Sequence, residues 1–369
     1  MSIIPFIRLD RQFERLKPEV MPAIERILSK GQVLQGMETK KLESSLCKLL
    51  KKKYCITVNS GTDALNFSLA SLNLPKGSKV AVSSMSFIAS ASVILHNDCI
   101  PVFVDVDPET MLMNQDNILE LINNESIDAI IAVHLYGQMQ PLEKVGKSAA
   151  AKKIPIIEDA AQSLGATRFA MPSEGYSEFT CISFDPTKVI GAYGSGGAIL
   201  TNNPELAEHI KLLRYHGHNG DGEYILAGFN SQMAEIQASL LNIKLNYLKE
   251  WQKKRTIIAE HYNNELKDLD SIKFFKTLDG NVHNFHKYVI LHENRDGLVK
   301  FLKNEGIITK IHYSTPLHQQ KEFENISSKR QLSIVEKLAK NIISLPIYPE
   351  LTISEISKVT ESIKNFIVK

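Results

Sequence analysis

The sequence predicts an α/β fold in which a mostly parallel sheet lies between layers of helices. Between residues 54 and 245, short apolar stretches alternate with segments of helical periodicity, such as 63–72 and 142–152, which is typical of such sheets. Seven strands are expected, at residues 55–58, 79–82, 100–104, 129–133, 154–157, 180–184 and 197–201. Ligands of parallel sheets bind beyond the carboxyl ends of the strands, so the loops after these strands are the candidates for a functional site.

The segments outside this region indicate a second, smaller unit. Residues 1–54 are predicted to form an arm followed by amphipathic helices, and residues 234–266 a long helix that leads away from the sheet. Beyond it we expect a smaller α+β fold, with elements at residues 288–291, 298–304 and 354–367, and a polar loop around Ser327 and Ser328. The prediction is of two domains, a large one over residues 1–249 that includes the arm and a small one over residues 250–369.

The composition excludes several classes of function. The 369 residues carry a formal net charge of +2 and 43% are hydrophobic, so whole-chain electrostatics gives no reason to expect binding to nucleic acid or to an anionic membrane. No apolar stretch reaches the length of a membrane span and the N-terminus has no long apolar core, which favours a cytoplasmic location. The four cysteines have no C-x-x-C spacing, so we expect free thiols and neither disulfides nor a metal site.

Lys188 is the first candidate for a catalytic residue. It follows the predicted strand 180–184, which carries Ser183, and it precedes the glycine-rich stretch GAYGSGG. Small neighbours give an amine room to move, as a lysine requires when it forms a Schiff base with an aldehyde cofactor. A lone lysine is usually a solvated surface charge, so this assignment depends on its companions. Ser183 is positioned to bind a phosphate group of such a cofactor.

A carboxylate at the end of the predicted strand 154–157 supplies the second part of the site. An unpaired buried charge is unfavourable, so Asp159 at this position needs a cation. A protonated pyridine nitrogen would be such a cation, and the ion pair would keep the ring electron-poor. Gln162 could then reach the phenolic oxygen of the ring. The adjacent Glu158 points the opposite way in an extended chain, and we expect it on a helix or at the surface.

Two further strand ends fit the same cofactor. Gly61 and Thr62 follow the first strand and begin a helix, so backbone N–H groups, the Thr62 hydroxyl and the helix dipole would face a phosphate. Phe87 follows the strand 79–82 and could stack on a flat heteroaromatic ring. The alternatives at these positions are an ordinary strand-to-helix turn and a phenylalanine of the core.

Several motifs in succession resemble one family. The stretches SGTDAL, EDAAQSLGA, SFDPTK with GSGGAILTNN, RYHGH, GFNSQMAEIQASLL and SLPIYPEL occur in this order. From about Gly31 to the C-terminus, the chain resembles the DegT/DnrJ/EryC1/StrS family of pyridoxal phosphate-dependent nucleotide-sugar aminotransferases, which have the type I fold of pyridoxal phosphate enzymes. The resemblance therefore implies pyridoxal 5′-phosphate as the cofactor.

The resemblance also implies a role for each matching position around the cofactor ring. Lys188 would form the Schiff base, Asp159 would contact the pyridine nitrogen, and Gln162 would lie at the ring hydroxyl. Phe87 occupies the position of the stacking aromatic residue.

The cofactor phosphate would be bound by residues of two subunits. The resemblance assigns it to Gly61, Thr62 and Ser183 of one chain. Asn230, in the stretch GFNSQ, would reach the phosphate of the neighbouring subunit, which implies an obligate homodimer with shared active sites.

One departure from the family pattern concerns anionic substrates. Many relatives have an arginine two residues after this asparagine, whereas this chain has Gln232, and a neutral amide cannot make the bidentate ionic contact of a guanidinium. The substrate-binding candidates that remain are Arg214, His216 and His218 of the RYHGH stretch. His312 and Tyr313 resemble the loop that closes over the sugar in the family.

The resemblance implies an aminotransferase that moves the amino group of L-glutamate to a nucleotide-diphosphate keto-sugar by a ping-pong mechanism. Glutamate would displace Lys188, and the freed amine would carry the proton between the donor carbon and the cofactor carbon. The stretches GSGGAI and SGTDAL favour the C3 ketone of the sugar. A C4 aminotransferase of the same family is an alternative.

Three other functions are alternatives for a chain with these motifs. The sugar 3-dehydratase branch of the family replaces the Schiff-base lysine by histidine, so Lys188 argues against it. A non-catalytic regulatory relative that binds the cofactor stays an alternative, although both Lys188 and Asp159 are present. A nicotinamide enzyme is excluded, because GAYGSGG precedes a strand and does not open a helix as a dinucleotide-binding motif must.

Overall fold

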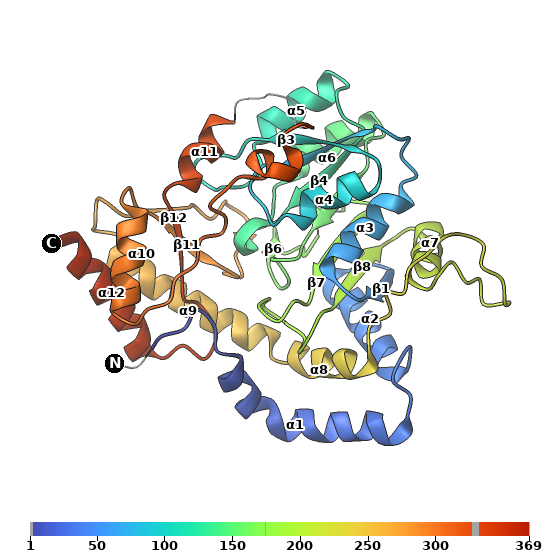
Figure 1. The fold of residues 1–369 in the computed structure, drawn as a ribbon, viewed down its shortest axis with the longest axis horizontal. Helices are drawn as coiled ribbons and strands as arrows, with labels where there is room; N and C mark the ends of the chain where they lie inside the picture. The colour runs from blue at the N-terminus through green and yellow to red at the C-terminus, as the bar shows by residue number, and fades with distance from the viewer. Residues whose placement is uncertain (1–2, 174, 327–331, 369) are drawn as a thin grey trace.

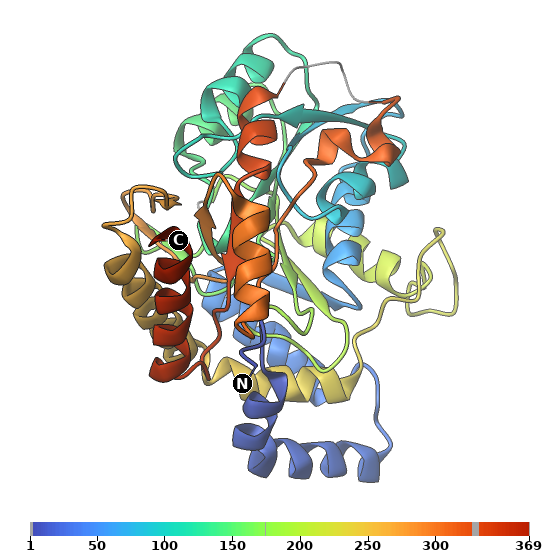
Figure 2. The same ribbon diagram turned by 60° about the vertical axis from the view of Figure 1, so that its left-hand side comes forward.

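The computed structural model describes residues 3–173, 175–326 and 332–368. It has the predicted α/β architecture, with one large sheet between helices and a smaller unit of sheet and helices beside it (Figure 1, Figure 2). The polar loop expected around Ser327 and Ser328 lies outside the described residues. In the part of the chain that is described, no helix is both long and apolar enough to span a membrane.

Seven strands of the described chain form the large sheet, in the order β1-β8-β7-β5-β4-β2-β3. They are β1 (Tyr54–Val58), β2 (Lys79–Ser83), β3 (Ile100–Val104), β4 (Ala129–Val133), β5 (Ile156–Asp159), β7 (Phe179–Ser183) and β8 (Gly197–Thr201). β8 is antiparallel to both of its neighbours and the other pairs are parallel, so the predicted sheet is confirmed. β5 lies two residues later than the predicted strand 154–157, so Glu158 and Asp159 belong to the strand.

Helices cover both faces of this sheet (Figure 1). They are α1 (Leu9–Lys30), α2 (Met37–Leu50), α3 (Gly61–Ser71), α4 (Ala89–His96), α5 (Gln115–Asn123), α6 (Glu143–Ala151), α7 (Pro204–Arg214) and α8 (Glu235–Leu245). Successive strand residues face opposite sides. Ile199 packs with residues of α3, α4 and α7, whereas Leu200 packs with residues of α1, α2 and α8. A third cluster packs α5 and α6 against strands that include β4. Burial on both faces explains why the strands are continuously apolar in sequence.

The smaller unit contains a sheet in the order β12-β11-β9. Its main elements are α9 (Leu248–Leu266), β9 (Lys273–Phe274), β11 (Tyr288–Leu291), α10 (Arg295–Asn304), β12 (Ile342–Leu345) and α12 (Ile353–Val368). The other short elements are η1 (Leu135–Gly137), β6 (Thr167–Arg168), β10 (Asn281–Val282), η2 (Leu317–Gln319), η3 (Lys321–Phe323) and α11 (Ser333–Ala339). The long helix predicted over 234–266 is two helices, α8 and α9, separated by a turn. The predicted domain boundary at 249 and 250 falls in the first turn of α9, and the division itself stays a prediction.

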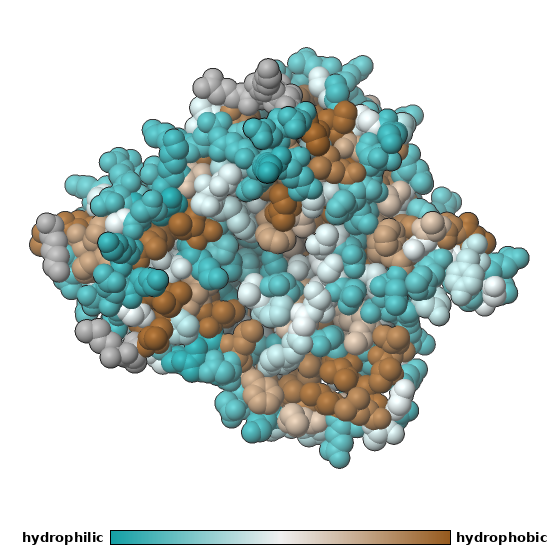
Figure 3. All heavy atoms as spheres, viewed as in Figure 1, coloured by the Kyte–Doolittle hydropathy of each residue, from teal (hydrophilic) through white to brown (hydrophobic). Residues whose placement is uncertain are grey.

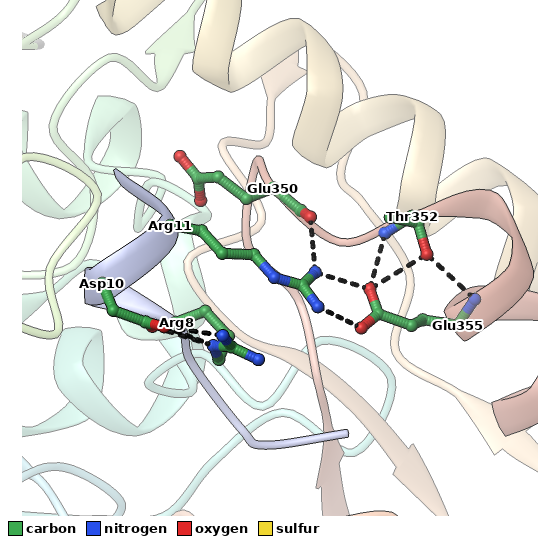
Figure 4. A network of polar contacts seen from close by, with 6 residues as sticks. All are labelled: Arg8, Asp10, Arg11, Glu350, Thr352 and Glu355. Carbon is green, nitrogen blue, oxygen red and sulfur yellow. Dashed lines mark hydrogen bonds and ion pairs between the residues drawn. The ribbon is translucent and has the colours of Figure 1, made fainter. Parts of the chain in front are cut away.

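The N-terminal arm is attached to the smaller unit. The backbone N–H of Ile4 donates to the carbonyl of Gly306 at 2.8 Å, and its carbonyl accepts from the N–H of Ile308 at 2.9 Å. Arg11 at the start of α1 makes a bidentate pair with Glu355 of α12, at 2.6 and 2.8 Å, and also donates to the carbonyl of Glu350 (Figure 4). These contacts fix the path of the arm.

Candidate active site

A cavity of about 400 Å³ lies where strands β1, β2, β5 and β7 end. It is the edge of the sheet at which ligands of this kind of fold bind. Nine residues predicted for the site line it, namely Gly61, Thr62, Phe87, Asp159, Gln162, Ser183, Lys188, His312 and Tyr313. Residues far apart in the sequence therefore meet in one place, because parallel strands bring their following loops to the same edge.

The start of α3 forms one end of the cavity. The Ser60 side chain caps the helix by accepting a hydrogen bond from the N–H of Asp63 at 3.0 Å, which leaves the N–H groups of Gly61 and Thr62 without helical partners. A Cβ atom at Gly61 would lie 2.6 Å from the Cβ of Ser183. Glycine is therefore required for the close approach of α3 and β7. The free N–H groups at the start of α3 face the cavity and suit an anionic phosphate.

Asp159 lies on another wall of the cavity and is almost fully buried. Its Oδ2 accepts a hydrogen bond from Ser90 Oγ at 2.7 Å, and its Oδ1 accepts one from the N–H of Ala161 at 3.2 Å. Ser90 in turn contacts Ser86 at 2.7 Å. These hydroxyls hold the carboxylate in one orientation. Neither serine is predicted as a site residue from the sequence. Their spacing of four residues, where a helix begins, is the signal that places them together.

Lys188 lies after β7 in a turn that fixes its backbone. Its N–H donates to the carbonyl of Asp185 at 2.9 Å, and the side chain of Asp185 accepts from the N–H of Thr187. Burial lowers the pKa of Lys188, while the carboxylates of Asp159 and Asp185 act in the opposite direction. A lowered pKa increases the fraction of free amine at neutral pH, as Schiff-base formation requires.

Glu158 is the clearest correction to the sequence analysis. It is neither on a helix nor at the surface, but fully buried in β5, with its side chain on the opposite side of the strand from Asp159. Its carboxylate contacts His134 Nε2 at 2.9 Å and accepts hydrogen bonds from Ser173 and Ser177. His134 Nδ1 accepts from the backbone N–H of Gln140, so Nε2 carries the proton that is donated to Glu158. Glu158 is thus part of the buried framework behind the cavity.

Gln162 and Phe87 occupy different depths of the cavity. Gln162 is buried, and its Oε1 accepts a hydrogen bond from the N–H of Tyr136 at 2.9 Å, which orients the amide. Phe87 is 52% exposed, so it is not a core residue, and its ring centroid lies 6.3 Å from that of Tyr313. Phe87 lines the cavity and is partly exposed, so its ring can offer an aromatic face to a flat cofactor.

Four predicted residues do not line the cavity within the described chain, namely Arg214, His216, His218 and Asn230. The Arg214 side chain is largely buried and bonds to Glu43 and to the carbonyl of Thr57, both at 3.2 Å, so it is engaged in holding α2, β1 and α7 together. This position does not support a role for Arg214 in binding substrate. His216 and Asn230 are exposed, on the segment after α7 that projects from the molecule (Figure 1).

The residues that meet in the cavity suit the binding of pyridoxal phosphate. It offers a phosphate site at the start of α3, a buried carboxylate for a pyridine nitrogen at Asp159, and an amine of lowered pKa at Lys188. Phe87 provides an aromatic face. Two residues that the sequence analysis did not single out, His286 and Lys287, also line the cavity from the segment before β11.

The chain is similar to known aminotransferases over nearly its whole length. A model of the DegT/DnrJ/EryC1/StrS aminotransferase family matches residues 14–364. The pleiotropic regulatory protein of Geobacillus stearothermophilus is 36% identical over 366 residues, which cover 98% of each chain. The UDP-2-acetamido-2-deoxy-3-oxo-D-glucuronate aminotransferase of Pseudomonas aeruginosa is 34% identical over 98% of this chain and 100% of its own. The crystal structure of DesV from S. venezuelae, in complex with a ketimine intermediate, superposes over 100% of both chains with a TM-score of 0.96 and 30% identity.

Proposed function

This chain belongs to the DegT/DnrJ/EryC1/StrS aminotransferase family, and from that premise we propose that it transfers the amino group of L-glutamate to the C3 ketone of a nucleotide-linked sugar. It is a pyridoxal phosphate-dependent sugar aminotransferase by its relatives and its fold. The observation that carries the assignment is the presence of Lys188 and Asp159 in one cavity, on the loops and ends of the neighbouring strands β7 and β5.

Several residues of the cavity have a task in this reaction. Pyridoxal phosphate, when bound, supplies an electron-poor ring that accepts the electron pair released at the carbon that loses its proton. The start of α3, with Thr62 and Ser183, would hold its phosphate, and Asp159 would hold the proton on its ring nitrogen. The Lys188 amine would take the proton from the α-carbon of the donor and return it to the sugar carbon in the second half of the cycle.

The name of a relative supports the position of the ketone. The P. aeruginosa enzyme is named for a 3-oxo sugar attached to UDP, and it matches this chain over its whole length. A C4 aminotransferase is the alternative within the same chemistry. The name of the G. stearothermophilus protein leaves a regulatory relative as the other alternative, but regulation alone would not need Lys188 with a lowered pKa beside Asp159.

A homodimer with shared sites is part of this proposal. The segment between α7 and α8 projects from the molecule and exposes large apolar side chains, including Tyr224, Ile225 and Phe229 at 50–67% exposure. In Figure 3, hydrophobic surface lies along this segment and over the region of α1 and α8. Exposed apolar groups of this extent are typical of an interface. Asn230 at the end of the segment would then reach the cofactor phosphate of the partner. We also propose a cytoplasmic location.

The test is amino transfer in solution. The purified protein, loaded with pyridoxal phosphate, is incubated with L-glutamate and either a nucleotide-linked 3-keto-sugar or its 4-keto isomer, and the position of the new amine is determined by NMR. The proposal predicts a 3-amino sugar and an equal amount of 2-oxoglutarate. Amination at C4 alone would favour the alternative, and no transfer with any keto-sugar would favour the regulatory relative.

A further inference from the structure

The cavity contains a second lysine that the reaction described above does not use. Lys287 lies just before β11 and is 9% exposed. Its backbone N–H donates to the carbonyl of Tyr136 at 3.1 Å, which fixes its position. Its Nζ makes no hydrogen bond or ion pair with any of the residues that the structure describes, and it lies 5.0 Å from the centroid of the Phe6 ring. The attached N-terminal arm therefore covers this ammonium group with an aromatic face.

The electrostatic surroundings of Lys287 are mostly positive. Burial, together with the nearby charges of Lys188 and Arg255, lowers the pKa of Lys287 to about 7, and Asp185 is the carboxylate that acts against this shift. The Arg255 guanidinium, which is not among the residues that line the cavity, donates to the carbonyls of Phe285 and Ile347, at 3.1 and 2.9 Å, so its position is fixed. Asp159 and Asp185 also line the cavity, but neither forms an ion pair with Lys287 within the described chain.

A buried ammonium group without a partner destabilises a protein unless a ligand pairs with it. The cavity offers space for such a ligand, because Lys287 and His312 both line it together with Lys188. His312 Nδ1 is hydrogen-bonded to Ser344 Oγ at 2.8 Å, which orients the ring, while its Nε2 has no partner among the described residues. A cation and an oriented imidazole side by side are suited to the two oxygens of a carboxylate.

We propose that Lys287 and His312 form a subsite that binds a carboxylate of a substrate, either of the amino donor or of an acidic sugar. The inference rests on the proposed amino transfer. The α-carboxylate of an amino donor is bonded to the carbon whose proton Lys188 removes, so it must bind close to Lys188. The diphosphate of a sugar nucleotide is bonded at C1 of the sugar, two carbons away from C3, and needs a more distant site than the α-carboxylate. The subsite replaces, in function, the arginine that the chain lacks at Gln232.

The test separates the two half-reactions in the enzyme loaded with pyridoxal phosphate. Lys287→Met removes the charge and keeps the length of the side chain, and Lys310→Met removes the charge of an exposed lysine nearby as the matched control. Single-turnover absorbance measures the first half-reaction with L-glutamate, and the second with a neutral 3-keto-sugar nucleotide or its uronate counterpart. Calorimetry measures the dissociation constant of 2-oxoglutarate independently of turnover.

For a donor carboxylate, Lys287→Met should raise the dissociation constants of glutamate and 2-oxoglutarate roughly 10- to 100-fold, as expected for the loss of a charged hydrogen bond. The neutral sugar and the Lys310→Met enzyme should be unaffected. For a sugar carboxylate, the same loss should affect the uronate substrate alone. Unchanged binding of every carboxylate would overturn the inference, and so would an equal loss with the neutral sugar.

The stability of Lys287→Met toward urea is a second readout. The change expected for the subsite is opposite in sign to the change expected if Lys287 only supports the fold. Without ligand, Lys287→Met should unfold at a higher urea concentration than the parent protein, because it removes a buried charge that has no hydrogen bond or ion pair among the described residues. A decrease would mean that Lys287 supports the fold, and would count against the subsite. If the parent protein transfers no amino group but still binds 2-oxoglutarate in a Lys287-dependent way, the proposed function fails while the subsite stands.

Discussion

Glu158 and Asp159 are adjacent in β5 and point to opposite sides of the sheet. Asp159 lines the cavity, where Ser90 donates to it at 2.7 Å, whereas Glu158 is paired with His134 at 2.9 Å in the interior. One strand therefore places one carboxylate in the cavity and the other in the buried framework behind it. The two can be changed independently, because their hydrogen-bond partners are separate.

Changing Glu158 should affect stability in a pH-dependent way. Burial alone would raise the pKa of Glu158, but the hydrogen bond from His134 lowers it to about 2 from the usual 4.5. A folded-state pKa below the unfolded value gives stability that is present above pH 4.5 and is lost as the pH falls toward 2. Glu158→Gln should therefore lower the free energy of unfolding at pH 7 by about 2 kcal/mol, and by less in acid.

Urea unfolding of the cofactor-free protein at pH 7 and pH 4 measures this difference. Glu125→Gln is the control, since it removes an exposed carboxylate that is paired with Lys152, and it should leave the unfolding midpoint nearly unchanged. An equal effect of Glu158→Gln at both pH values would show that the charge of the carboxylate is not what stabilises the fold.

Changing Asp159 should affect turnover. Asp159→Asn keeps the shape of the side chain but removes the charge that would hold a proton on the pyridine nitrogen, so turnover should fall roughly 100-fold or more while the protein stays folded. Ser90→Ala, which removes one hydrogen bond to that carboxylate, should lower turnover about 5-fold.

Ser68→Ala is the matched control for this pair. Ser68 is equally buried, but its hydroxyl donates to the carbonyl of Ala64 and does not contact Asp159. Steady-state kinetics measures the turnover of the three variants, and circular dichroism shows whether each is folded. Normal turnover in Asp159→Asn would mean that another residue protonates the ring.

Gly61→Ala should weaken cofactor binding. The added Cβ would lie 2.6 Å from Ser183 Cβ and would push α3 away from β7, widening the site at which the phosphate binds. We expect the dissociation constant of pyridoxal phosphate, measured by fluorescence titration, to rise about 10-fold or more. The double variant Gly61→Ala/Ser183→Gly removes the two shortest contacts and leaves the Cα of residue 183 at 3.2 Å, but it also removes a hydroxyl, so it should recover part of the stability without recovering affinity. Full affinity in Gly61→Ala would place the phosphate elsewhere.

Mixing two inactive variants tests the shared site. If Asn230 completes the site of its partner, Lys188→Ala and Asn230→Ala homodimers should be inactive at limiting cofactor. After subunit exchange of an equal mixture, half of the dimers are mixed and each has one intact site, so about one quarter of the parent activity should return. No recovery in dimers shown to have exchanged by native mass spectrometry of differently tagged chains would mean that Asn230 acts within its own chain.

The sheet and the centre of the site could be predicted from the sequence for one reason. Apolar strands of a parallel sheet are recognisable, and the segments that follow them must meet at one edge, so the sequence indicates that Lys188 and Asp159 lie in one site. The orientation of Asp159 relative to Glu158 also followed from the alternation of a strand.

The roles of Glu158, Arg214 and Lys287 could not be predicted, because they depend on contacts between segments that are distant in the sequence. The burial of Glu158 required His134 and Ser173, which no local pattern connects to it. Arg214 was a reasonable candidate for an anion site, but Glu43 from α2 engages its guanidinium. Lys287 comes from the smaller unit and enters the cavity through tertiary packing alone, so its sequence surroundings contained no signal.

The most direct measurement of the central claim is the position at which the cofactor is covalently attached. The protein loaded with pyridoxal phosphate is reduced with borohydride, digested and mapped by mass spectrometry. The account predicts a visible absorbance band that disappears on reduction, with the label on Lys188 and none in Lys188→Ala. A label on Lys287, the other lysine of the cavity, or an unlabelled and colourless protein would contradict it.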